Sequence, residues 1–231
     1  MTSNPFSREQ NIPFLDLIQM PIISESEASL RPMEKIFLAQ FMMLVRPAVA
    51  LELGVHKGFT TRFLAEFIAA NHLDCSLHGF DLANVLADLR NSSPDIVELE
   101  KQNRLELVPG ALPTSLESWL KTHPVVDFAL VDAMHDFAHV FSELYLIWPH
   151  LSEGGIILCH DYAPGDHDGV ICAINYFVSV TPGAECISLK STAKADQFPW
   201  NGTDTYMYHS ALAAVRRNPF NIVVPGNWTA A

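Results

Sequence analysis

Basic residues are scarce in this chain of 231 residues, which has 14 lysines and arginines against 26 aspartates and glutamates and a formal net charge of −12. Nucleic-acid binding depends on clustered Lys and Arg side chains that neutralise phosphates. The composition therefore argues against a nucleic-acid partner. The acidic surplus points to no other partner by itself, although it favours solubility.

Cysteine is also sparse. The four cysteines include no pair at the C-x-x-C spacing of redox and zinc motifs, and two of them lie in strand-like apolar runs. Disulfides are a feature of secreted chains. We therefore expect reduced thiols, as in a cytoplasmic protein; they are Cys75, Cys159, Cys172 and Cys186.

Long apolar runs are absent. None approaches the roughly 18 residues that a membrane span needs. The N-terminal stretch has no basic region followed by an apolar region, which is the signature of a secretory signal. The sequence thus predicts no membrane partner and a cytoplasmic location.

The chain does contain a regular alternation of strands and helices. Five short apolar runs predict strands, and amphipathic segments follow them; the runs are 48–55, 76–82, 105–110, 125–133 and 154–162. Strands that alternate with helices favour a parallel sheet with helices on both faces. Two further strand-like runs, 184–191 and 203–210, are joined by a loop-like connector and predict an antiparallel last strand. The expected fold is a Rossmann-like, doubly wound, seven-stranded α/β sheet.

The first 30 residues lack this alternation. Prolines interrupt them and they show little periodicity, so we expect an N-terminal arm or lid over 1–30. The apolar spacing over 31–47 predicts a helix, which opens a single main domain over 31–231.

The turn after the first strand is the first candidate ligand site. It reads E-x-G-x-x-x-G, with Glu52, Gly54 and Gly58, and Thr60 and Thr61 follow in the first turn of the next helix. Ligands bind doubly wound sheets at the carboxyl ends of the strands. A tight G-x-G-x-x-G loop, which would hold a diphosphate, is missing. An ordinary strand–turn–helix connection is the alternative at this point.

Acids and histidines follow the other strands. Asp81 ends the second strand, where a carboxylate can accept hydrogen bonds from a ribose diol, or can cap a helix. "VDAMHD" after the fourth strand supplies Asp132 and His135, and "CHDY" after the fifth supplies His160 and Asp161. All of these residues belong to one rim of the predicted sheet.

These motifs, in this order, resemble the class I S-adenosylmethionine-dependent methyltransferases. The stretches that carry the resemblance are 51–66, 79–82, 126–137 and 151–162. Within that superfamily the chain is similar to methyltransferase family 24, the group with cephalosporin-biosynthesis and macrolide sugar O-methyltransferases. Members of that group often read D-G-D-H-S-Y after the fourth strand and D-D after the fifth.

The resemblance implies O-methylation of a small-molecule hydroxyl and assigns a cofactor site. Glu52, Gly54 and Gly58 would line the methionine and ribose side, Asp81 would hold the ribose, and the loop after the third strand would reach the adenine. Ala111 stands there where a polar residue is common. The full set of expected cofactor contacts is Glu52, Gly54, His56, Gly58, Thr60, Thr61, Asp81, Leu82, Gly110, Ala111 and Asp132.

The resemblance also implies a catalytic centre, with or without a divalent cation. The positions that bind magnesium in relatives are Asp132, His160 and Asp161 here. His160 replaces an acid, and imidazole suits transition metals better than Mg²⁺. Either the site takes another metal such as Mn, or the metal is lost and His160 acts as a base. His135 is the candidate general base, or it braces the following helix.

Several alternatives are open on the sequence alone. The chain could be a non-catalytic S-adenosylmethionine-binding or regulatory module, or an NAD-dependent oxidoreductase. A homodimer through the arm or the first helix is a further expectation. In the fold that the chain resembles, the loop with Phe198 and Trp200 often borders the acceptor, so these side chains could stack on it, or they could pack against the arm over 1–30 or a second subunit. His167 is expected to be solvated.

Overall fold

The computed structural model describes residues 30–162, 167–189, 197–199, 206–208 and 211–217. The predicted arm over 1–30 therefore lies outside the described residues, apart from Leu30, and so does Trp200. Phe198 is described only as part of a short strand. No helix in the described ranges is long and apolar enough to cross a membrane.

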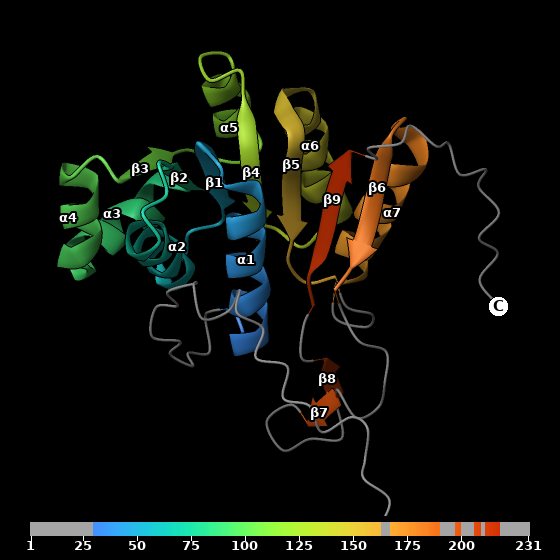
Figure 1. The fold of residues 1–231 in the computed structure, drawn as a ribbon, viewed down its shortest axis with the longest axis horizontal. Coiled ribbons are helices and arrows are strands. Elements are labelled where there is room, and N and C mark those ends of the chain that lie inside the picture. The colour runs from blue at the N-terminus through green and yellow to red at the C-terminus, as the bar shows by residue number, and fades with distance from the viewer. Residues whose placement is uncertain (1–29, 163–166, 190–196, 200–205, 209–210, 218–231) are drawn as a thin grey trace, which may run out of the picture.

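A seven-stranded sheet organises the chain, in the order β3-β2-β1-β4-β5-β9-β6 (Figure 1). The pairs from β3 through β5 are parallel, whereas β9 runs antiparallel to both of its neighbours. This confirms the predicted doubly wound sheet with an antiparallel last strand. The strands are β1 Val49–Leu53, β2 Ser76–Asp81, β3 Leu105–Pro109, β4 Val126–Val131, β5 Leu151–Cys159, β6 Ala184–Ser188 and β9 Ala213–Arg217.

The identity of the last strand was predicted wrongly. Of the run 203–210 the structure describes β8 (Tyr206–Tyr208), which pairs with β7 (Gln197–Pro199) in a separate two-stranded sheet. β7 lies within the connector that was expected to be loop. The strand that enters the main sheet is β9, over 213–217. Its alanines have weak strand propensity, whereas the tyrosines of β8 have a high one. Burial between β5 and β6 overrides that preference, since Ala213, Ala214 and Val215 are fully buried.

Helices cover both faces of the sheet (Figure 1). One apolar cluster joins α1, α2, α3 and α4 to one face, and a second joins α5, α6 and α7 to the other. Because both faces are covered, the central strands are buried on both sides, which is typical of parallel sheets. The helices are α1 Pro32–Val45, α2 Phe59–Ala70, α3 Ala83–Ser92, α4 Pro94–Lys101, α5 Thr114–Leu120, α6 Phe137–Ile147, the 3₁₀ helix η2 Trp148–His150, and α7 Asp168–Val180.

The strand order reverses between β1 and β4, which lie side by side in parallel register. The helix after β1 packs on one face and the helix after β4 packs on the other. The connections therefore diverge and leave a crevice at the carboxyl ends of these strands, where doubly wound sheets bind ligands. The fold places the two candidate motifs, after β1 and after β4, on either side of this crevice.

Glu143 on α6 gives the folded protein a pH-dependent stability. Its side chain is fully buried, and neither carboxyl oxygen has a hydrogen-bond partner among the described residues. Burial raises the pKa of this carboxyl to about 8. This folded-state pKa lies above the unfolded-state value. The contribution of Glu143 to the stability of the folded protein is therefore present at low pH, and it is lost as the pH rises through the folded-state pKa.

Glu143→Gln should therefore gain stability over the wild type as the pH rises. We expect the difference in unfolding free energy to grow by roughly 2–4 kcal/mol between about pH 5 and pH 8. Urea unfolding at several pH values measures it, with Glu66→Gln as the control at an exposed glutamate. Glu52 titrates in the same window but is present in every variant. A difference that does not change with pH would contradict the expectation.

Candidate functional site

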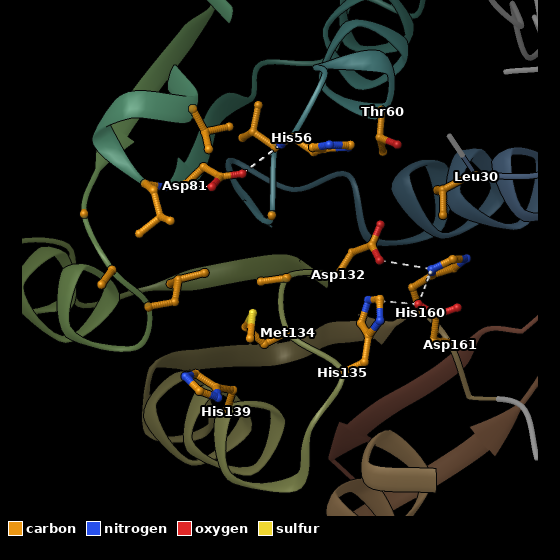
Figure 2. A pocket seen from close by; sticks show the side chains of 18 residues that line it. Leu30, His56, Thr60, Asp81, Asp132, Met134, His135, His139, His160 and Asp161 are labelled. Atoms are coloured by element: carbon orange, nitrogen blue, oxygen red, sulfur yellow. Dashed lines mark hydrogen bonds and ion pairs between the residues drawn. The ribbon is translucent and has the colours of Figure 1, made fainter. Parts of the chain in front are cut away.

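A cavity of about 630 Å³ opens at the carboxyl ends of β1, β2, β4 and β5. Figure 2 shows its two polar ends: His56 and Asp81 lie on one side, and Asp132, His135 and Asp161 lie on the other. Its volume is in the range of small-molecule and cofactor sites. The cavity is therefore large enough to hold a cofactor at one end and a second reactant at the other.

The first polar end is built on the Asp81 carboxylate, which the backbone orients. The N–H of His56 donates to Oδ2 at 2.8 Å, and the N–H of Leu82 donates to Oδ1 at 2.7 Å. His56 has a φ of 48°, a conformation that is uncommon outside glycine. Each carboxylate oxygen can still accept another hydrogen bond, so Asp81 remains able to bind a diol.

Gly54 closes the floor between β1 and β4. Its φ is 99°, and a Cβ atom built on it would lie 2.3 Å from the carbonyl oxygen of Asp132. The N–H of Asp132 donates to the carbonyl of Leu53 at 2.9 Å, which continues the pairing to the end of both strands. Only glycine permits this approach, and the approach holds Asp132 beside the turn.

Most of the expected cofactor contacts line the cavity, but three do not. Glu52 is buried under α2 beside Thr61, and Gly58 is the left-handed N-cap of α2, packed against Leu89. These residues lie behind the cavity wall for two reasons. Successive side chains of a strand point to opposite faces of the sheet, which directs Glu52 toward α2, and Gly58 lies at the start of that helix. Burial raises the pKa of Glu52 to about 8, and the charges of Asp132 and Asp81 add to that rise. The expected residues that do line the cavity are Gly54, His56, Thr60, Asp81, Leu82, Gly110, Ala111 and Asp132.

The second polar end centres on His160, which lies among three carboxylates. Nδ1 is 3.0 Å from Asp132 Oδ1 and 3.2 Å from Asp161 Oδ2, and Nε2 is 3.2 Å from Glu34 Oε2. Burial alone would lower the pKa of His160, but the charge of Asp132 and the hydrogen bonds to all three acids raise it well above its usual range. The three acids therefore stabilise positive charge at this point.

Asp161 links His160 to two more histidines. His135 Nε2 is 3.0 Å from Asp161 Oδ2, and His167 Nε2 is 3.9 Å from Asp161 Oδ1. The rings of His135 and His167 meet edge to face with centroids 4.3 Å apart. Burial opposes ionisation of Asp161, yet the hydrogen bond with His160 and the charges of the three histidines lower its pKa to about 2. His135 thus has a carboxylate partner. His167, which was expected to be solvated, lies near the same carboxylate.

Among the residues that the structure describes, two groups of side chains could hold a metal ion, and both use Asp161. One is Asp132, His160 and Asp161, as the sequence predicts, and the other is His135, Asp161 and His167. Within each group the ligand atoms lie within 4.8 Å of one another. In the first group the second ring nitrogen of His160 contacts a buried carboxylate, the arrangement usual for a metal-bound histidine. The first group therefore fits a divalent cation.

The sequence prediction missed Glu34 and the apolar part of the wall. Glu34 lies in the first turn of α1, and its carboxylate accepts the N–H of Arg31 at 2.8 Å. An acid at this position is a recognisable helix-start signal, but it does not reveal a contact with a residue 126 positions away. Leu30 and Met134 line the cavity as well, and as single apolar residues they gave no signal in the sequence.

The start of α6 carries two more polar side chains near the cavity. Asp136 caps this helix, since its carboxylate accepts the N–H of Ala138 and of His139. His139 lies in the first turn of the helix, with Nδ1 2.6 Å from Asp136 Oδ2, and it also contributes to the cavity wall. Because Asp136 fixes the start of α6, it also fixes the backbone that presents His135.

Comparison with known proteins connects this site to a family. Residues 51–162 match a family model described as a methyltransferase domain. No curated protein sequence matches the chain significantly. Many solved structures share its fold.

An O-methyltransferase from Streptomyces achromogenes involved in tomaymycin synthesis, solved with S-adenosylmethionine, has a TM-score of 0.60 and 14% identity over 85% of this chain and 92% of its own. An O-methyltransferase from Bacillus cereus, solved with S-adenosylhomocysteine, has a TM-score of 0.58 and 16% identity over 85% and 83%. A methyltransferase from Podospora anserina, bound to S-adenosylhomocysteine, has a TM-score of 0.56 and 18% identity over 90% and 82%. At these identities the likeness concerns the fold.

Proposed function

We propose that this chain, whose residues 51–162 match a family model described as a methyltransferase domain, transfers the methyl group of S-adenosylmethionine to a hydroxyl group of a small molecule. The observation that carries the proposal is one continuous cavity. It joins Asp81 and His56, suited to a ribose, to His135 and Asp161, suited to proton removal. Two solved structures with the same fold contain S-adenosylhomocysteine, and one contains S-adenosylmethionine.

Asp81 and the loop after β3 are proposed to bind the nucleoside part of the cofactor. The Asp81 oxygens accept the ribose hydroxyls, and the backbone at Gly110 and Ala111, with the side chain of Leu82, borders the adenine. All of them line the cavity. When bound, the sulfonium of the cofactor supplies an electrophilic methyl group.

His135 is proposed to remove the proton of the acceptor hydroxyl. Asp161 is ionised over the whole neutral range, since its pKa is about 2, so it can accept a hydrogen bond from Nε2 of His135 at 3.0 Å. In this tautomer Nδ1 carries the lone pair that accepts the proton. The transfer forms a C–O bond on the acceptor and breaks the C–S bond, whose electron pair stays on sulfur. Asp161 then stabilises the imidazolium.

Asp132, His160 and Asp161 are the residues that would hold a divalent cation. Such a cation would lower the pKa of an acceptor hydroxyl and orient it. The three ligand atoms lie at the same end of the cavity as His135. The proton acceptor and the candidate cation site therefore act on the same reactant.

The family match supports this function over the two alternatives. An NAD-dependent oxidoreductase would need a diphosphate loop that the turn at 54–58 does not provide. A non-catalytic module has no use for the contacts that order His135, Asp161 and His160. A homodimer and a cytoplasmic location stay predictions.

Calorimetric titration with S-adenosylhomocysteine, and with NAD in parallel, tests the proposal directly. We expect binding of S-adenosylhomocysteine with a dissociation constant in the micromolar range and no binding of NAD. Screening of hydroxylated acceptors, with radiolabelled methyl transfer as readout, then identifies the second reactant. Absence of S-adenosylhomocysteine binding would contradict the proposal.

Asp81→Ala should weaken S-adenosylhomocysteine binding by about 1–3 kcal/mol, since charge-assisted hydrogen bonds to the ribose are lost. The same titration measures this change. Asp74→Ala is the matched control, because it removes an exposed acid just before β2, at the opposite end of that strand. Unchanged affinity in the Asp81 variant would place the ribose elsewhere.

A further inference from the structure

Glu34 brings a carboxylate from the first helix to the end of β5. Its side chain is fully buried, and Oε2 lies 3.2 Å from Nε2 of His160. His160 turns its other nitrogen toward Asp132 and Asp161, as Figure 2 shows. The imidazole is therefore held at both nitrogens by acids from different elements, and only Nδ1 faces the two acids that line the cavity.

The Glu34 carboxylate is itself fixed by two backbone groups. The N–H of Ala211, which precedes β9, donates to Oε1 at 2.8 Å, and the N–H of Arg31 donates to Oε2 at 2.8 Å. These contacts come from opposite ends of the described chain. They leave the carboxylate one orientation, in which Oε2 accepts the Nε2–H of His160. That hydrogen bond fixes the ring with Nδ1 directed at Asp132 and Asp161, and a dication bound between these three groups would replace the Nδ1 proton.

We propose that Glu34 is the outer carboxylate that makes His160 a metal ligand through Nδ1, and that this site binds a transition-metal dication in preference to Mg²⁺. Metal-bound histidines usually donate their second N–H to a carboxylate, which fixes the ring and raises its basicity as a ligand. The inner ligand set is one imidazole nitrogen and two carboxylate oxygens. Mg²⁺ prefers oxygen ligands, whereas Mn²⁺, Co²⁺ and Zn²⁺ accept imidazole.

This inference rests on the proposed function for one point only, namely that the bound metal would assist methyl transfer. Metal binding itself can be measured whether or not the protein transfers methyl groups. Glu34 also has a local role, because it accepts the N–H of Arg31 at the start of α1. A purely structural Glu34 would affect the stability of the fold without a specific effect on metal affinity. Direct metal binding therefore separates the two roles.

The test is titration of the metal-free, full-length protein with Co²⁺ and with Mg²⁺, followed by calorimetry and by the visible absorption of bound Co²⁺. We expect the wild type to bind one Co²⁺ per chain at this site, at least 100-fold more tightly than Mg²⁺. His160→Ala should lose the site. Glu34→Gln should weaken Co²⁺ binding by about 10–100-fold, the usual effect of removing an outer-sphere partner, and should change the Co²⁺ spectrum.

Glu143→Gln is the matched control, since it replaces another fully buried glutamate, whose carboxyl oxygens have no hydrogen-bond partner among the described residues. It should bind Co²⁺ like the wild type. If Glu34→Gln does not fold, Glu34→Asp, which keeps the charge but shortens the reach to His160, should show the same loss. The double variant Glu34→Gln with His160→Asp should shift the preference toward Mg²⁺, because all inner ligands are then oxygens.

Three results would overturn the inference: no dication binding by the wild type, equal affinity for Co²⁺ and Mg²⁺, or unchanged Co²⁺ affinity and spectrum in folded Glu34 variants. In the first case the three acids would serve only to hold His160 as a cation. The affinity for S-adenosylhomocysteine is measured by a separate titration of the same preparations. A protein that binds S-adenosylhomocysteine but no metal contradicts only this inference, whereas loss of S-adenosylhomocysteine binding contradicts the proposed function.

Discussion

Asp161→Ala is expected to lower the rate of methyl transfer by about 10²–10⁴-fold, the range of general acid–base catalysis, while S-adenosylhomocysteine affinity stays within about threefold. The variant removes the carboxylate that contacts both His135 and His160. His135 then lacks the partner that fixes its tautomer, and the candidate cation site loses one of its three ligands. The cofactor end of the cavity, around Asp81, is left unchanged.

The measurement compares single-turnover methyl transfer with calorimetric S-adenosylhomocysteine binding in the same preparations. Asp161→Asn is the conservative variant, since its amide oxygen can still accept a hydrogen bond from His135 but carries no charge. We expect its rate to fall between those of the wild type and Asp161→Ala. Near wild-type turnover in Asp161→Ala would exclude Asp161 from catalysis.

Sequence alone predicted the parts of the site that follow strands. Because parallel strands end on the same rim, residues 81, 132 and 160 could be brought together from their positions in the pattern, without coordinates. The structure places Asp81, Asp132 and His160 in one cavity. The turn after β1 was predictable for the same reason, since the glycines follow the first strand directly.

The rest depended on contacts between segments far apart in the chain. Glu34 reads as an ordinary helix-start acid, and only the packing of α1 against the end of β5 shows that it contacts His160. The position of β9 depended on the space between β5 and β6, which its small side chains fill. Neither residue type nor periodicity carries that information. An element can be predicted from the sequence when its own residues determine its position. It cannot be predicted in this way when a neighbouring element determines its position.

Gly54→Ala is expected to destabilise the protein by about 4 kcal/mol, of which roughly 1–3 kcal/mol comes from the positive φ and a similar amount from overpacking. The new Cβ would meet the backbone of Asp132 and Ala133, which belongs to the strand end and cannot move aside like a flexible side chain. The ends of β1 and β4 must then separate, and this displaces Asp132 from His160. S-adenosylhomocysteine binding should therefore fall together with stability.

Gly154→Ala provides the matched control for this prediction. Gly154 on β5 also has a positive φ, of 82°, but no atom lies within 4 Å of a Cβ built there. It should lose only about 1–2 kcal/mol, the cost of a left-handed conformation in a non-glycine residue, and should bind S-adenosylhomocysteine like the wild type. Urea unfolding followed by circular dichroism measures both variants. An equal loss in the two would mean that backbone conformation alone accounts for Gly54, and that the close approach of β1 and β4 does not hold the site together.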